Sequence, residues 1–253
     1  IGHAGEMVTS GRVALLGACG TAEVSVYRRP VIGLIATGDE LKEPGAKLGP
    51  GEIFESNRLA LARLVEQTGA VPRIFPLVSD TLASTIEALE VAFSECDAVV
   101  TSGGVSVGEH DYVKEALERL GGSLDFWKVR IKPGKPFVYG QFDGKSLFGV
   151  PGNPVSAFVT FLTLVRPAIM KMTGATDTSL PSHPAKLFAP LVNRGDRRHF
   201  MRVYVDNGGR VHPVGLQASH ALGSLGKANG LIDVPPETTL PEGVVQQVLR
   251  WSM

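Results

Sequence analysis

The sequence predicts an α/β domain with a mostly parallel sheet flanked by helices, followed by a small all-β domain and preceded by a short β-rich segment. Two observations support this fold class. From Pro30 to Gly174, short buried apolar runs alternate with helical patterns, which is typical of a parallel sheet covered by helices. From Pro181 to Met253, only short alternating runs occur, which indicates strands joined by turns. We therefore divide the chain into residues 1–29, 30–174 and 181–253.

The first segment, residues 1–29, is broken by glycines and is too short to bury a core of its own. Residues 22–27 alternate apolar and polar side chains, which predicts one strand with an exposed face. The sequence begins with Ile1 and has no basic stretch followed by a long apolar core, so we expect no secretory signal. We interpret this segment as the tail of a β-rich upstream domain.

The first half of the α/β segment contains three predicted strands and two predicted helices. The strands are Val31–Ala36, Val71–Val78 and Asp97–Thr101. The first helix begins at Ser56-Asn57, which we expect to cap it, and ends before Gly69. In the second helix, Leu82 to Phe93, the apolar positions step by four, three and four residues.

The second half of this segment ends in a long apolar helix. The predicted elements are a helix over Tyr112–Leu120, a β stretch over Phe126–Ile131, a hairpin of Phe137–Gln141 with Lys145–Val150, and a helix over Pro154–Met172. Asp143-Gly144 is the turn of the hairpin. The longest apolar run in the chain, Val155–Val165, is about half a membrane span, so we expect no transmembrane helix.

The C-terminal segment shows no helical period, and we expect a barrel or a sandwich. Its predicted strands are Ala185–Leu191, Phe200–Asp206, Arg210–Val214, Leu231–Val234 and Val244–Leu249. Residues 173–184 form the linker that precedes it.

Composition excludes several classes of protein. With 25 basic and 25 acidic residues the net charge is zero, which gives no support to nucleic-acid binding through bulk charge. Only two cysteines occur, far apart, so neither a disulfide framework nor a zinc knuckle is expected, and a reducing cytoplasm fits this usage. No motif for a covalent nucleophile is present.

Polar residues follow each predicted strand of the α/β segment, at the edge where open parallel sheets bind ligands. The first strand is followed by Glu40, the second by Asp80, and the third by the glycine-rich run Ser102–Gly108 and Asp111. An isolated Asp after a strand is more often a turn former, but the recurrence at three strands favours a site. Carboxylates beside a phosphate-like ligand would bind Mg²⁺. The small residues Ser102, Gly103, Gly104 and Ser106 can expose backbone N–H groups to an anion.

Two further loops could bind an anion. On one strand, Lys128, Arg130 and Lys132 would share a face, and Pro133-Gly134 would return Lys135 toward the same place. Such a charge run is either a solvated surface or a phosphate clamp. The second loop consists of Pro151, Gly152, Asn153 and Pro154. It precedes the long helix and forms a rigid helix N-terminus suited to an anion, or simply a helix cap. In the last domain, Arg202 lies in an arginine cluster and Ser219 in a run of neutral donors.

Five ordered motifs in this sequence resemble the molybdopterin molybdenumtransferases, the MoeA type that also includes the E domain of gephyrin. The motifs are Thr37-Gly38-Asp39-Glu40-Leu41, Ser56-Asn57, Thr101 to Glu109 with Asp111-Tyr112, Ile131 to Pro136, and Val150 to Ser156. The resemblance covers essentially the whole chain. The sheet domain alone would also resemble molybdopterin adenylyltransferases, but the appended β domain favours the molybdenumtransferase.

The resemblance implies a molybdopterin-binding fold and a transferase of molybdenum cofactor biosynthesis. The implied reaction is the Mg²⁺-dependent insertion of molybdate into adenylylated molybdopterin, with release of AMP. By resemblance, Glu40, Asp80 and Asp111 are acidic site and metal residues, and Lys128 and Lys132 are basic catalytic residues. The resemblance implies substrate binding by Pro151, Pro154, Arg202 and Ser219. The strand-end and loop patterns described above add Ser102, Gly103, Gly104, Ser106, Lys135, Gly152 and Asn153 to the candidate substrate-binding residues.

The resemblance also implies a cytoplasmic homodimer with small-molecule substrates and, as a candidate protein partner, a molybdopterin adenylyltransferase. No nucleic-acid or membrane partner is expected. Members of the family carry a further upstream region, so we expect this chain to turn over poorly alone. Two alternatives stay open: a gephyrin-like scaffold that binds a peptide, and a molybdopterin adenylyltransferase. A scaffold has no need of three strand-end carboxylates, whose joint presence favours the enzyme.

Overall fold

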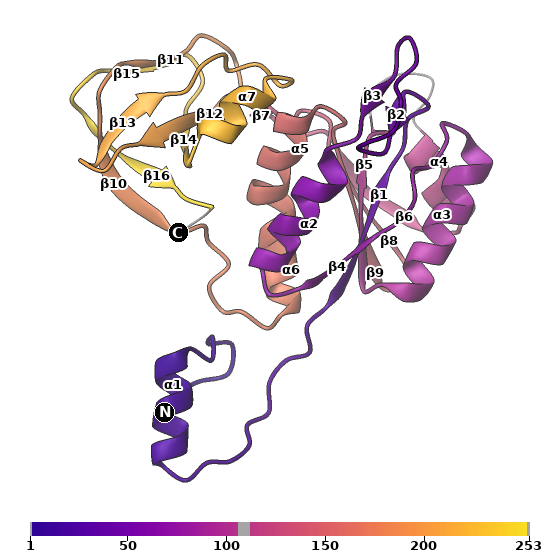
Figure 1. Ribbon diagram of the computed structural model, residues 1–253, viewed down its shortest axis with the longest axis horizontal. Coiled ribbons are helices and arrows are strands. Elements are labelled where there is room, and N and C mark those ends of the chain that lie inside the picture. The colour runs from indigo at the N-terminus through magenta and orange to yellow at the C-terminus, as the bar shows by residue number, and fades with distance from the viewer. Residues whose placement is uncertain (1, 106–111, 252–253) are drawn as a thin grey trace.

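The computed structural model describes residues 2–105 and 112–251, and of Phe126 and Trp127 only the backbone. Its central sheet has the strand order β4-β1-β5-β9-β8-β6 (Figure 1). The strands are β1 (Val31–Ala36), β4 (Val71–Ile74), β5 (Ala98–Ser102), β6 (Ser123–Trp127), β8 (Val138–Phe142) and β9 (Lys145–Val150). The pairs β4–β1, β1–β5 and β5–β9 are parallel, whereas β9–β8 and β8–β6 are antiparallel. The prediction of a mostly parallel sheet is confirmed.

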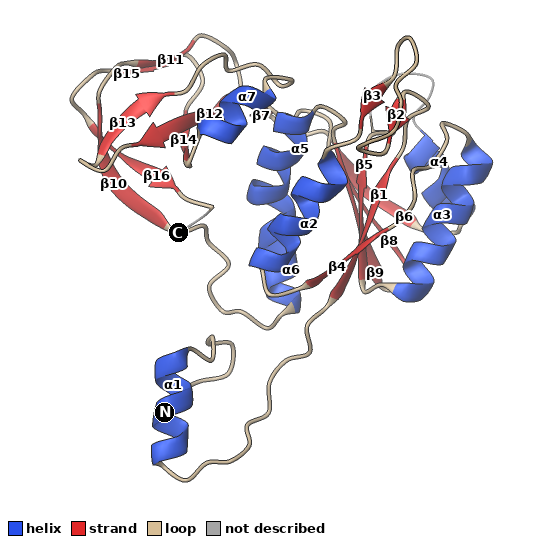
Figure 2. Cartoon of the chain, viewed as in Figure 1, coloured by secondary structure: helices blue, strands red, loops and turns tan. Residues whose placement is uncertain are grey.

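Helices cover both faces of this sheet, as Figure 2 shows. On one face lie α2 (Asn57–Gln67), α5 (Pro154–Thr160) and α6 (Arg166–Met172), and on the other lie α3 (Leu82–Glu95) and α4 (Tyr112–Arg119). Side chains of β1 alternate between them: Ile32 and Leu34 join the core under α2 and α5, and Ile35 joins the core under α3 and α4. Burial on both faces explains why this strand is a continuous apolar run in the sequence.

The long apolar helix over residues 154–172 contains a π-helical turn at Phe161–Val165. The turn precedes Pro167, which has no N–H to donate to the carbonyl of Thr163, so the local hydrogen-bond ladder is displaced. By length and composition alone this helix could cross a membrane, but half of it is buried inside the molecule. A core helix passes the same test, so the finding is weak evidence for a span.

The C-terminal strands close into a barrel, so of the two predicted architectures, barrel and sandwich, the structure has the barrel. Its sheet has the order β13-β10-β16-β14-β12-β7, and β13 also pairs with β12. The elements are β7 (Ile131–Lys132), β10 (Ser182–Leu187), β12 (Arg198–Val205), β13 (Arg210–Pro213), β14 (Gly230–Val234) and β16 (Val245–Leu249), beside a separate pair of β11 (Leu191–Asn193) and β15 (Thr238–Leu240). The segment is not entirely β, because α7 (Leu222–Lys227) lies between β13 and β14. Six residues are too few to show a helical period.

The predicted strand at residues 22–27 is wrong, and so is the β-rich character of the first segment. Its regular element among the described residues is a helix, α1 (Ser10–Ala18), which Thr9 caps by accepting from the N–H of Arg12. Residues 21–30 pair with no strand in the described part of the chain, and an alternating pattern forms a strand only beside a partner. No residue of α1 is buried, and Figure 1 shows the helix apart from both domains.

Two other predicted strands differ from the structure. The strand predicted over Val71–Val78 ends at Ile74, because Pro76 cannot donate to a ladder, and a single bridge between Thr37 and Val78 follows. The β stretch predicted over Phe126–Ile131 is two strands in two sheets: β6 ends at Trp127, and β7 pairs with β12 of the barrel. Lys128 between them has φ 84°, which no strand residue adopts.

Candidate ligand cavity at the strand ends

A cavity of about 640 Å³ lies at the carboxyl ends of β1, β5 and β9, and we call it the strand-end cavity. Nine of the sequence-predicted site residues line it: Glu40, Asp80, Ser102, Gly103, Gly104, Pro151, Gly152, Asn153 and Pro154. The structure therefore brings together four loops that are far apart in the sequence. Their placement agrees with the rule for ligand sites in open parallel sheets.

Three acidic residues line this cavity. One is Glu55, which is paired with Arg58, and the other two are the predicted Glu40 and Asp80. The loops that carry these two are joined, because the N–H of Asp80 donates to Oδ1 of Asp39 at 3.0 Å. Asp111, the third predicted acidic residue, lies outside the described residues, as does Ser106. Within residues 2–105 and 112–251 no group of three metal-binding side chains occurs. Mg²⁺ is commonly held by one or two carboxylates plus substrate phosphates, so Glu40 and Asp80 fit that ion.

The turn after β5 brings backbone close to the cavity. Gly103 has φ 90°, and a Cβ atom at this position would lie 2.8 Å from the carbonyl oxygen of Thr37. Both observations restrict this position to glycine. The N–H of Gly103 donates to the carbonyl of Val150 at 3.2 Å, which joins the turn to the end of β9.

The loop from Pro151 to Pro154 ends at the predicted place, with Asn153 at the N-cap and Pro154 as the first residue of α5. The side chain of Asn153 makes no capping hydrogen bond. The N–H of Val155 donates to the carbonyl of Ser219 at 3.1 Å, so one donor of this helix N-terminus is already engaged by the barrel. The loop therefore has fewer amides for an anion than the sequence suggests.

The basic segment does not line the strand-end cavity. Lys128, Lys132 and Lys135 are exposed, and the residue of this segment in the cavity wall is Pro136. The prediction that Lys128, Arg130 and Lys132 share one strand face is wrong, because the chain leaves one sheet at Lys128 and joins the other at β7. Arg130 instead donates to the carbonyl of Asp196 at 3.2 Å.

Arg202 is completely buried in the barrel, and burial lowers the pKa of its guanidinium. It donates to Oγ of Ser224 at 2.9 Å and to the carbonyls of Leu216 and Ala218 at 2.8 and 3.2 Å. The bonds to Leu216 and Ala218 hold the start of the loop that carries Ser219. That loop contacts α5 through a separate bond, from the N–H of Val155 to the carbonyl of Ser219. The contacts of Arg202 are thus with the protein, and the next loop residue, His220, lines the cavity.

Sequence reasoning missed the carboxylate that caps α2. Ser56 occupies the N-cap but makes no side-chain capping bond. Instead, Oε1 of Glu55 accepts from the N–H groups of Asn57 and Arg58 at 2.5 and 2.9 Å. Glu55 and Arg58 form an ion pair at 2.9 Å, and both side chains are at most 3% exposed. The sequence did contain a signal for this cap, because Glu55 directly precedes the predicted cap and a carboxylate is favourable near a helix N-terminus.

Other cavity residues carried no signal as site residues in the sequence. They are Thr37, Leu41, Ile53, Phe54, Val105 and Pro136. Ile53 and Phe54 belong to β3 (Ile53–Phe54), which pairs in parallel with β2 (Leu41–Lys42) and carries partly exposed apolar side chains to the cavity wall.

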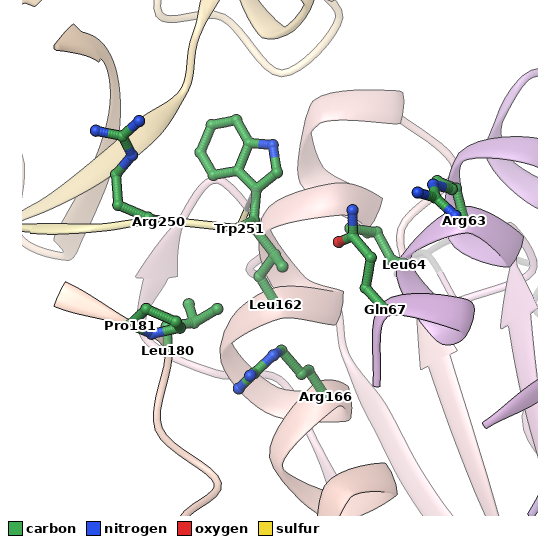
Figure 3. Close-up of a pocket in the computed structure, with 9 residues that line it drawn as sticks. All are labelled: Arg63, Leu64, Gln67, Leu162, Arg166, Leu180, Pro181, Arg250 and Trp251. Carbon is green, nitrogen blue, oxygen red and sulfur yellow. The ribbon is translucent and has the colours of Figure 1, made fainter. Parts of the chain in front are cut away.

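A second cavity of about 350 Å³ lies between α2, the long helix and the end of the barrel, and Figure 3 shows its lining. Three arginines border it, but they do not converge on one point (Figure 3). Arg63 is paired with Glu66 at 2.9 Å, and Arg166 donates to the carbonyls of Thr178 and Ser179 at 2.8 and 3.0 Å. This arginine-bordered cavity contains no acidic residue and lies away from the strand ends.

The sheet with its strand-end cavity defines a class of protein. Residues 33–171 match the family described as "Probable molybdopterin binding domain", and residues 184–251 match the "MoeA C-terminal region (domain IV)". The chain belongs to the family of MoeA-type molybdopterin molybdenumtransferases.

Similar proteins have related names. The chain is 39% identical to a molybdopterin molybdenumtransferase of Haemophilus influenzae, over 92% of this chain and 59% of that protein. It is 37% identical to molybdopterin molybdenumtransferase 2 of Mycobacterium tuberculosis, over 99% and 63%. Among solved structures, a molybdopterin biosynthesis MoeA protein from Pyrococcus horikoshii superposes with a TM-score of 0.86 at 30% identity, covering 98% of this chain and 61% of that chain. The chain thus spans about three fifths of the length of these curated relatives.

Proposed function

We infer that the strand-end cavity binds adenylylated molybdopterin, and that the complete protein inserts molybdate into it with release of AMP. The observation that supports this most is the convergence of four strand-end loops on one cavity of about 640 Å³, within the residues that match the molybdopterin-binding family. That volume lies in the range of small-molecule sites, roughly 300–1,000 Å³. The curated names of the relatives support the reaction class.

Glu40 and Asp80 are the proposed ligands of Mg²⁺, with Asp111 as a third. When bound, Mg²⁺ would neutralise phosphate charge and polarise phosphoryl oxygens. The two carboxylates come from different loops, and the hydrogen bond from Asp80 to Asp39 holds those loops together. The protein thus holds the two carboxylates in position before the ligand binds.

The remaining predicted residues bind and orient the ligand in this proposal. Ser102, Gly103, Gly104 and Ser106 on one side, and the loop from Pro151 to Pro154 on the other, enclose its phosphates. The long side chains of Lys128, Lys132 and Lys135 approach the bound ligand from outside the cavity wall and neutralise its charge. Arg202 acts through the loop that it fixes, and Ser219 on that loop contacts the ligand.

The part of the relatives outside the match contributes to turnover in this proposal. The barrel (residues 181–253) and the α/β domain (residues 30–174) supply one half of the site, and the upstream region of the complete protein, of which residues 1–29 are the tail, supplies the rest. The complete protein is a cytoplasmic homodimer that receives its substrate from a molybdopterin adenylyltransferase.

The test separates binding from turnover. The chain is titrated with adenylylated molybdopterin by calorimetry in the presence of Mg²⁺ and again in EDTA. We expect Asp80→Asn to weaken binding at least tenfold in Mg²⁺ and to remove most of the effect of EDTA. Asp143→Asn is the control, because Asp143 lies in the β8–β9 turn at the other end of the sheet and Asn tolerates its φ of 49°. Absence of binding by the wild-type chain would contradict the proposed function.

Turnover is then measured as AMP released after addition of molybdate. We expect the isolated chain to release AMP slowly and the complete protein to release it fast, because interactions made only in the transition state raise the rate. Equal rates would show that residues 1–253 suffice.

A further inference from the structure

The side-chain amide of Asn57 connects two loops of the strand-end cavity. Its Nδ2 donates to Oγ of Ser102 at 2.7 Å and to the carbonyl oxygen of Gly152 at 2.7 Å. Ser102 ends β5 and Gly152 follows β9, so one buried side chain on α2 holds the ends of two strands. Both hydrogens of the amide are used by these two bonds.

The carbonyl of Gly152 fixes which way the amide faces. In the reversed orientation the Oδ1 atom of Asn57 would stand 2.7 Å from another oxygen that can only accept, which is repulsive. The N–H groups of Asn57 therefore point at Gly152 and Ser102. The position of Asn57 is itself fixed, because its backbone N–H donates to the buried carboxylate of Glu55 at 2.5 Å.

This orientation determines what Ser102 can offer to a ligand. A serine hydroxyl has one hydrogen to donate, and here its oxygen already accepts from Asn57. The hydrogen of Ser102 is then directed away from Asn57, and Ser102 lines the cavity. At the same time, the Gly152 carbonyl, whose oxygen would repel an anion, is bonded to the amide.

We propose that Asn57 is a positioning residue that sets the hydrogen-bond polarity of the strand-end cavity, so that Ser102 donates to an anionic oxygen of the bound ligand. The choice of a phosphate-containing ligand rests on the proposed function. The bonds of Asn57 to Ser102 and Gly152 are observed in the structure and are independent of that function. The strand-end pattern in the sequence does not predict this role, because the sequence marks Asn57 only as part of a helix cap.

The first experiment measures AMP binding by calorimetry, because AMP carries the phosphate of the proposed ligand. We expect Asn57→Ala to weaken AMP binding at least tenfold. Asn193→Ala is the matched control: Asn193 is also buried and its Nδ2 donates to the carbonyls of Arg197, Val234 and Pro235, but it lies in the barrel away from the cavity. An equal loss of AMP affinity in both variants would mean that the effect is general destabilisation and would overturn the proposal. If Asn57→Ala does not fold, Asn57→Ser, which is too short to reach both partners, replaces it.

A double-mutant cycle tests whether Asn57 acts through Ser102. We expect Asn57→Ala to cost much less AMP affinity in a Ser102→Ala background than in the wild-type chain, because the bond through which it acts is already gone. Additive losses would refute the route through Ser102.

Hydrogen exchange keeps this proposal separate from the proposed function. The amide of Gly103, which donates to Val150, is expected to exchange at least tenfold faster in Asn57→Ala than in Asn193→Ala. If the wild-type chain binds no AMP but this amide is deprotected, the proposed ligand is wrong and the positioning role of Asn57 stands. If exchange at Gly103 is unchanged, Asn57 does not position the turn.

Discussion

Replacement of Glu55 by alanine is expected to destabilise the α/β domain far more than removal of any exposed carboxylate. Glu55 accepts from two amides of the first turn of α2 and pairs with Arg58 at 2.9 Å, with both side chains buried. The variant leaves the Arg58 guanidinium buried beside the carbonyl of Phe75, with Glu43 as its remaining acidic partner at 2.7 Å. Breaking a buried pair by removing one partner costs about 3–5 kcal/mol.

The matched control is on the same helix with the same spacing. Arg63 and Glu66 also pair at 2.9 Å and three residues apart, but their side chains are 71% and 47% exposed, so Glu66→Ala is expected to cost about 0–1 kcal/mol. Urea unfolding at pH 7 measures both free energies, and thermal unfolding should show a shift of roughly 6–20 °C for Glu55→Ala at about 2–4 °C per kcal/mol. If both variants lose the same small amount, the buried network does not hold the start of α2.

Three further variants test other parts of the structure. Burial, together with the nearby positive charges of Lys132, Arg202 and Arg197, lowers the pKa of His199 to about 4. Between pH 6.5 and pH 4, His199 is therefore protonated in the unfolded chain but neutral in the folded chain. The contribution of His199 to the free energy of unfolding is complete above pH 6.5 and is lost toward pH 4, by a maximum on the order of 3 kcal/mol. The free energy of unfolding of His199→Gln should therefore fall less than that of the wild-type chain between pH 6.5 and pH 4. An equal fall in both would exclude His199 as the cause. Gly103→Ala should lower the free energy of unfolding by an amount on the order of 1–3 kcal/mol. Gly51→Ala is its control and should cost less, because Gly51 has a similar φ of 81° but open space around an added Cβ. Equal losses in urea unfolding would mean that the contact with Thr37 relaxes freely. Lys132→Ala should weaken AMP binding and reduce its salt dependence, because a charged contact with phosphate is lost, and an unchanged salt slope in calorimetry would argue against that contact.

The order of strands and helices in the α/β domain could be predicted because burial determines it. Val31–Ala36 is apolar throughout since both its faces are covered, and the helix at Leu82 repeats its apolar residues at the period of one buried face. The strand-end rule then located Glu40, Asp80 and the turn at Ser102–Gly104 in the cavity wall without any contact being known. The other four predicted cavity residues, Pro151 to Pro154, were located by the pattern of a rigid helix N-terminus.

The sequence could not predict features that depend on a partner distant in the chain. Lys132 belongs to the barrel sheet only because β12, more than sixty residues later, pairs with β7. Residues 22–27 alternate as a strand does, yet no strand lies beside them in the described part of the chain. In the same way, Asn57 has the local pattern of a helix cap, and its bonds to Ser102 and Gly152 arise from tertiary packing alone.

The measurement that tests the central claim most directly is a crystal structure of the chain grown with adenylylated molybdopterin and Mg²⁺. The account predicts ligand density in the strand-end cavity, with its phosphates between Ser102 and the loop at Pro151 and with Glu40 and Asp80 beside the metal. Density in the arginine-bordered cavity at Arg166 and Trp251 instead, or a strand-end cavity that stays empty at saturating ligand, would contradict it.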